Sequence, residues 1–130
     1  MDSSMAILVL LVIGLLSVLA VVARFSKPRL NKQHFQKHWD KIETESNAVA
    51  ALVAADSLVD QALKQAGIKG STMGERLNNS TGLIGDIDGV WRAHKLRNRV
   101  VHEPGTQVVH SEFERAIRKF KRALKDLRAL

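Results

Sequence analysis

An unbroken apolar run near the amino terminus constrains this chain more than any other feature. Residues 6–23 read AILVLLVIGLLSVLAVVA, eighteen positions without a charged side chain. An α-helix rises about 1.5 Å per residue, so the run would extend roughly 27 Å, close to the thickness of the hydrocarbon core of a bilayer. The sequence therefore predicts a transmembrane anchor over residues 1–24 and a separate domain over residues 25–130.

The charges that flank this run predict its orientation. A cleaved signal peptide, which is the alternative interpretation, carries positive charge ahead of its apolar segment. Here only Asp2 precedes the run, whereas Arg24, Lys27, Arg29 and Lys32 follow it. Because positively charged residues stay on the cytoplasmic side, we expect a single-pass protein of the plasma (inner) membrane with its carboxy-terminal domain in the cytoplasm.

The residue types and motifs that the sequence lacks exclude several kinds of chemistry. The chain has no cysteine, which excludes disulfides, zinc knuckles and thiol catalysis. Its five histidines are scattered, so we expect no metal site. The sequence has no glycine-rich phosphate loop, nucleophile elbow or calcium loop, and we expect no cofactor.

The charge of the part that follows the anchor predicts an anionic partner. All 20 Lys and Arg residues lie at or beyond Arg24, together with 12 of the 13 acidic residues, which gives this part a net charge of +8. RNA phosphates and lipid headgroups both fit such a charge, and the charge alone does not choose between them.

Apolar spacing predicts an all-α fold for this part. Phe35, Trp39 and Ile42 begin a pattern with spacings of four and three that continues to Gly67. The pattern predicts one helix of about thirty-five residues with a kink near residues 44–47. Phe35 and Trp39 are expected to pack in the core or a dimer interface rather than at the membrane surface.

Three further helices are predicted along the chain. A short helix is expected over residues 73–79 and another over residues 84–101. The last is expected to start at Ser111, which would cap it with Glu114 three positions on, and its apolar stripe runs to Leu127. Four helices joined by short loops predict a compact four-helix bundle.

The segment that carries chemistry is HKLRNRVVHEPG, residues 94–105. Arg97, Asn98 and His102 form the pattern Arg-Asn-x-x-x-His at the carboxyl end of a predicted helix. This pattern in a small helical domain resembles the HEPN superfamily. The resemblance covers the helical layout of residues 31–130, but in residue identity it rests on this one motif.

The resemblance implies either cleavage of RNA or binding without cleavage. Many HEPN domains are metal-independent endoribonucleases that act as homodimers, so Arg97 and His102 would be the catalytic pair and Asn98 would position them. Other HEPN domains bind RNA or proteins without cutting. We therefore expect an RNA-binding protein, with metal-independent cleavage and a neutralising protein partner as further candidates. The alternative is a non-catalytic HEPN-like binding or scaffold module at the inner membrane.

The residue types of the motif suit metal-free RNA cleavage. Attack by the 2′-hydroxyl on the adjacent phosphate needs a proton acceptor, a proton donor and a cation near the developing charge. Imidazole and guanidinium supply these groups. In an ideal helix Arg97 and His102 lie about 140° apart. We therefore expect the helix to fray or turn at residues 101–103, before Pro104, and to bring them together.

Several other residues are candidates for the same site. Trp91 and Lys95 share their helical pitch with Asn98 and are expected to form the wall of a cleft. His94 lies on the apolar pitch and is expected to pack in the core. Asp56 lies on the inward face of its helix and should pair with an arginine, Arg97 or Arg99, whereas the alternative places it in solvent.

The last predicted helix is strongly basic and supplies further candidates. Contact with RNA phosphates or lipid headgroups is one interpretation, and an ordinary solvated face is the other. The candidate contacts are Arg115, Arg118, Lys119 and Arg122.

Overall fold

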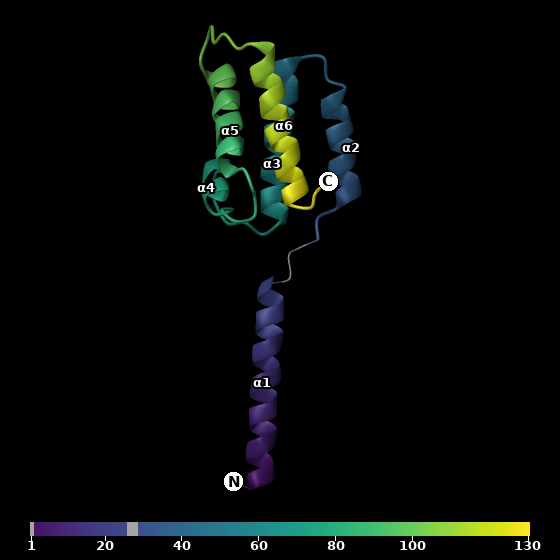
Figure 1. Ribbon diagram of the computed structural model, residues 1–130, viewed down its shortest axis with the longest axis vertical. Helices are drawn as coiled ribbons and strands as arrows, with labels where there is room; N and C mark the ends of the chain where they lie inside the picture. Colours follow the sequence, from purple (N-terminus) through teal and green to yellow (C-terminus); the bar gives the residue numbers. More distant parts are fainter. Residues whose placement is uncertain (1, 26–28) are drawn as a thin grey trace.

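The computed structural model describes residues 2–25 and 29–130, and the protein is all-helical within these two ranges (Figure 1). Lys27, one of the flanking charges, lies outside the described residues. The helices are α1 (Ser3–Phe25), α2 (Lys32–Glu43), α3 (Ala48–Gln65), α4 (Met73–Asn78), α5 (Ile87–His102) and α6 (His110–Asp126). The predicted all-α class is confirmed.

Helix α1 contains the apolar run. Its segment Ser3–Ala23 is long and apolar enough to cross a membrane. The large apolar side chains from Met5 to Val22 are exposed, so α1 adds nothing to the core of the other helices. A helix that is apolar on all sides and unburied has the length and composition of a membrane span, which a signal sequence also has.

The expected single helix from residue 31 to Gly67 is wrong, because the chain folds back between α2 and α3 into a hairpin (Figure 1). Asn47 starts α3, since its side-chain oxygen accepts a hydrogen bond from the backbone N–H of Ala50 at 2.9 Å. Glu45 in turn accepts from the backbone N–H of Asn47 at 2.8 Å. The apolar pitch continues across this turn because both helices present an apolar face to the same core.

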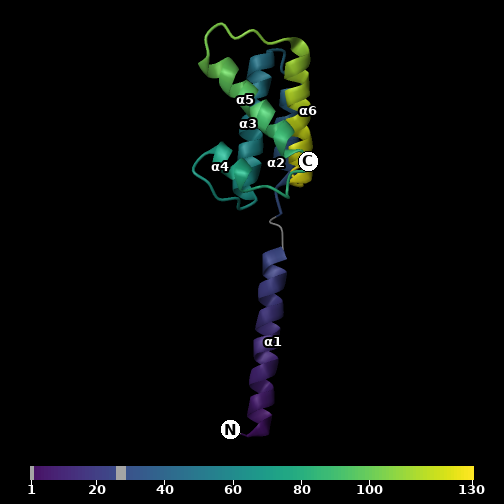
Figure 2. The ribbon, with the colours of Figure 1, turned by 60° about the vertical axis from the view of Figure 1, so that its left-hand side comes forward.

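Helix α3 is the central element of the bundle. It packs against α2, α4, α5 and α6, and α6 also packs against α5 (Figure 2). Phe35, Trp39 and Phe120 are fully buried at this centre, so the expected core packing of Phe35 and Trp39 is confirmed. The indole N–H of Trp39 donates to Glu43 at 2.8 Å, which satisfies its one polar group.

Helix α4 follows the expected start and is held to α3 by a buried arginine. Thr72 accepts a hydrogen bond from the backbone N–H of Glu75 at 3.1 Å, as an N-cap does. Arg76 is only 5% exposed. It donates to both carboxylate oxygens of Asp60, at 2.6 and 3.1 Å, and to the backbone oxygen of Gly70.

The ends of α3 and α6 share one geometry with different residues. At the end of α3, Gly67 has φ +79° and the backbone N–H of Ile68 donates to Leu63 at 3.0 Å. At the end of α6, Arg128 occupies the equivalent left-handed position with φ +61°.

The start of α6 differs from the expected one, because Val109 rather than Ser111 precedes the helix. Val109 donates its backbone N–H to the side chain of Glu112.

Candidate functional site

Helix α5 stays regular through the whole Arg-Asn-x-x-x-His motif. Asp86 caps its start by accepting from the backbone N–H of Gly89 at 2.9 Å, three residues later than the predicted start at residue 84. At the other end His102 is still helical, and Glu103 donates its backbone N–H to Arg99 at 2.9 Å. The expected turn at residues 101–103 therefore does not bring the motif residues together.

Arg97 and His102 consequently lie about 140° apart around the axis of α5. Within the described residues, no hydrogen bond or ion pair joins the two side chains. Neither Arg97 nor His102 lines either of the two cavities described below. His102 is exposed at the end of the helix.

Arg97 instead faces α3, where it meets a buried carboxylate. Asp56 is 4% exposed, and its Oδ2 lies 3.5 Å from the Nε of Arg97. The Oδ1 of Asp56 lies 2.7 Å from the Nδ1 of His94. The expected pairing of Asp56 with Arg97 is confirmed, and the solvent-exposed alternative is wrong. A buried carboxylate without such partners would be strongly destabilising.

Asn98 joins Arg97 to His94 and so closes a ring of contacts that includes this carboxylate. The guanidinium of Arg97 donates to the side-chain oxygen of Asn98 at 3.0 Å. The amide nitrogen of Asn98 lies 3.4 Å from the Nε2 of His94. Donation from Nδ1 of His94 to Asp56 leaves its Nε2 as the acceptor for this amide.

His94 belongs to this cluster but is not part of the Arg-Asn-x-x-x-His motif. Its side chain is 13% exposed, which agrees with the expected interior position. The signal was present in the sequence, since His94, Arg97 and Asn98 have the i, i+3, i+4 spacing of one helix face. The cluster ties α5 to α3 and pairs the charge of Arg97 with Asp56, although the buried Nε of Arg97 has no hydrogen-bond partner within the described residues.

A second face of α5 carries the remaining predicted residues. Trp91, Lys95, Asn98 and His102 follow spacings of four, three and four, which place them within a sector of about 60°. The ammonium of Lys95 lies 5.9 Å from the ring centroid of Trp91. This stripe, residues 91, 95, 98 and 102, therefore includes His102 and leaves Arg97 out.

A basic groove lies between α5 and α6, with a cavity of about 380 Å³. Its floor is built from small side chains at Gly89, Ala93 and Ala116. Both helices supply cations to its walls, and Glu112 is the acidic residue among the lining side chains. The basic lining residues are Arg92, Lys95, Arg99, Arg115 and Lys119.

Only half of the predicted phosphate contacts belong to this groove. Arg115 and Lys119 line it. Arg118 and Arg122 lie elsewhere on α6, where they pair with Glu114 at 3.9 Å and with Asp126 at 3.2 Å. Arg99, the other expected partner of Asp56, lines the groove instead.

The groove keeps most of its positive charge unpaired. Lys119 binds Asp86 at 2.5 Å, and this hydrogen bond, together with the backbone N–H of Gly89, lowers the pKa of Asp86. In residues 2–25 and 29–130, no carboxylate forms an ion pair with the other four basic lining residues. Repulsion among these cations is relieved when an anion binds between them.

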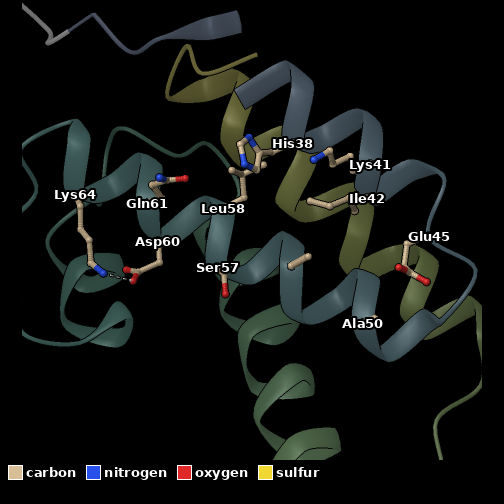
Figure 3. A pocket seen from close by; sticks show the side chains of 11 residues that line it. His38, Lys41, Ile42, Glu45, Ala50, Ser57, Leu58, Asp60, Gln61 and Lys64 are labelled. Atoms are coloured by element: carbon tan, nitrogen blue, oxygen red, sulfur yellow. Dashed lines mark ion pairs between the residues drawn. The ribbon is translucent and has the colours of Figure 1, made fainter. Parts of the chain in front are cut away.

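A larger cavity of about 760 Å³ lies between α2 and α3 (Figure 3). Its floor contains Ile42 and Leu58, and its rim carries both signs of charge, as Lys41 and Glu45 show. Asp60 and Lys64 on the same rim form an ion pair at 3.0 Å. This balance gives the cavity no preference for anions or cations.

No group of three or more metal-ligating side chains gathers anywhere in the part of the chain that the structure describes. Comparison of the chain with family models, curated proteins and solved structures found no match.

Proposed function

We propose that this protein is a membrane-anchored RNA-binding protein whose α5–α6 groove contacts RNA phosphates. The observation that carries the proposal is the set of four groove cations that lack a carboxylate partner within the described residues: Arg92, Lys95, Arg99 and Arg115. Guanidinium and ammonium groups in this arrangement suit a chain of phosphates, because each phosphate contact releases a counterion.

The topology of the bundle favours RNA over lipid headgroups as the anion. The chain enters the bundle at the start of α2, and six residues separate this start from the end of α1. Two of the four cations, Arg99 and Arg115, lie near the junction of α5 and α6, at the opposite end of the bundle, whereas Arg92 lies in the first half of α5 (Figure 1). A helix of eighteen residues, such as α3, spans about 27 Å, several times the Debye length of about 8 Å at physiological salt.

The proposed binding is non-catalytic. Arg97 is paired with Asp56, and His102 lies on another face of α5, so a single chain does not assemble the two groups that cleavage needs. The HEPN-like assignment remains part of the proposal, supported by the helical bundle and the motif. Cleavage is the alternative, and it needs a homodimer in which the partner supplies the missing group.

A binding assay with matched variants tests the proposal. The full chain in detergent micelles is titrated with fluorescent single-stranded RNA. Arg99→Gln with Arg115→Gln should weaken binding about tenfold, on the order of 1 kcal/mol or slightly more. Arg118→Gln with Arg122→Gln removes the same charge outside the groove and should weaken binding less than threefold. Equal weakening by the two pairs would overturn the proposed location.

The same RNA tests the catalytic alternative. Incubation with and without EDTA should leave the RNA intact in both samples. Metal-independent cutting that is lost in both Arg97→Ala and His102→Ala would establish the nuclease and overturn the non-catalytic proposal. A neutralising protein partner belongs to that alternative alone.

We place α1 in the plasma (inner) membrane with the bundle in the cytoplasm. Because the chain has no cysteine, single cysteines report this topology directly. In sealed right-side-out membrane vesicles, an impermeant maleimide should label Ser3→Cys at once and Ser111→Cys only after permeabilisation. The reverse pattern would contradict the orientation, and release of unlabelled soluble protein would contradict the anchor.

A further inference from the structure

The two tryptophans of the chain occupy different environments. Trp39 is fully buried and its N–H donates to Glu43. Trp91 is half-buried, and its N–H has no hydrogen-bond partner within the described residues. Trp91 packs against the edge of the core, and the exposed part of its indole with the unused donor is left for a ligand.

The ring of Trp91 is held in place by its neighbours. A Cβ atom at Gly74 on α4 would lie 3.1 Å from Cη2 of Trp91, so any larger residue there would force the ring to shift by a few tenths of an ångström. The ring of His94 meets Trp91 edge-on with centroids 5.9 Å apart. His94 is itself fixed by Asp56, so the buried cluster supports the indole from behind.

Lys95 joins this indole to the basic groove. Its side chain lines the groove and its ammonium lies over the Trp91 ring at 5.9 Å. Lys95 is exposed, and its flexible stem lets the ammonium move from the ring to a phosphate. The ring face that Lys95 covers is then available to a flat, uncharged group.

We infer that the ligand of the groove is single-stranded RNA, with an unpaired base stacked on Trp91 and its phosphates between α5 and α6. This inference rests on the proposed function and specifies the ligand. A double helix turns its base faces inward, so it can fill the groove but not stack on Trp91. His102 lies about 16 Å further along the same stripe and offers a second flat surface.

Three probes separate stacking from charge attraction. The full chain in micelles is titrated with a short oligoadenylate, with double-stranded RNA of the same length and with inorganic polyphosphate. Oligoadenylate should bind most tightly and quench the emission of Trp91, read in a Trp39→Phe variant. Polyphosphate should bind the groove without quenching, because it carries no base.

Substitutions at position 91 supply the matched control. Trp91→Leu should weaken oligoadenylate binding about tenfold and leave polyphosphate binding within twofold. Trp91→Phe keeps an aromatic face and should restore most of the affinity. Emission of the buried Trp39 reports in both variants whether the bundle remains folded.

The outcomes distinguish base stacking on Trp91 from phosphate binding in the groove. Oligoadenylate binding that resists Trp91→Leu, or equal affinity for the duplex, overturns stacking and leaves the phosphate groove intact. Failure of all three probes to bind overturns both. Loss of polyphosphate and oligoadenylate binding together in Trp91→Leu, with Trp39 emission unchanged, also overturns the stacking role.

Discussion

Replacement of Asp56 by asparagine tests the buried cluster that joins α3 to α5. The substitution keeps the shape of the side chain but removes its charge and presents an N–H donor where Arg97 needs an acceptor. One hydrogen bond, from His94 to the remaining oxygen, survives the change. Arg97 keeps its hydrogen bond to Asn98, but its buried Nε, which lies 3.5 Å from Asp56 without a hydrogen bond, loses its ion pair.

The expected loss of stability follows from the burial of the three groups. Removal of one partner from a fully buried ion pair costs about 3–5 kcal/mol. Here Asp56 is 6% exposed in its side chain but Arg97 is 25% exposed, so water compensates part of the loss. A value of about 2 kcal/mol remains, similar to one hydrogen bond to a charged group. It lowers the melting temperature by roughly 10 °C for a domain of this size.

Thermal unfolding in micelles, followed by the emission of the buried Trp39, measures this loss. Asp40→Asn is the matched control, because Asp40 is exposed and accepts its side-chain hydrogen bond from Gln36, one turn earlier. The control should change stability by less than about 0.5 kcal/mol. An Asp56→Asn protein that melts with the control would refute the structural role of the cluster.

Three further substitutions have expected effects on stability. Arg128→Gly should raise the melting temperature by a few degrees, about 0.5–1 kcal/mol, because glycine adopts positive φ without strain; a lower value would contradict this. Gly89→Ala should cost about 1–3 kcal/mol in the same assay, since its Cβ would lie 2.7 Å from Cγ of Asp86, which caps α5, and 2.8 Å from Cδ of Lys119. Unchanged melting would show that these side chains move aside without cost. Burial opposes ionisation of Asp60, but hydrogen bonds from Arg76 and Lys64 outweigh it and hold the pKa below the usual 3.8. Stability from Asp60 is therefore present above pH 3.8 and lost as the pH falls through the lower folded pKa; urea unfolding of Asp60→Asn should show a shallower acid decline.

The sequence predicted most helices because their apolar faces are periodic and their ends carry strong signals. The run in α1 and the stripe in α6 that contains Phe120 and Leu124 are examples. The break between α2 and α3 was misjudged because it contains neither glycine nor proline. Local side-chain hydrogen bonds of Thr44, Glu45 and Asn47 mark it instead, and such polar caps are weaker signals in a sequence than glycine or proline.

The candidate site was predicted in part. Inward placement of Asp56 followed from its helical pitch, and its pairing with Arg97 followed from the cost of burying a charge. The basic groove could not be predicted, because it depends on which faces of α5 and α6 meet. Arg115 and Arg118 look alike in the sequence, yet one lines the groove and the other pairs with Glu114.

The salt dependence of RNA binding tests the groove most directly. Each phosphate contacted on a single strand contributes a slope of about −0.7 in the plot of log affinity against log salt concentration. Four unpaired cations predict a slope near −3 for the full chain. Arg99→Gln with Arg115→Gln should reduce its magnitude by about 1.4, whereas the same slope in the variant and the wild-type protein would contradict the assignment of the groove as the RNA-binding surface.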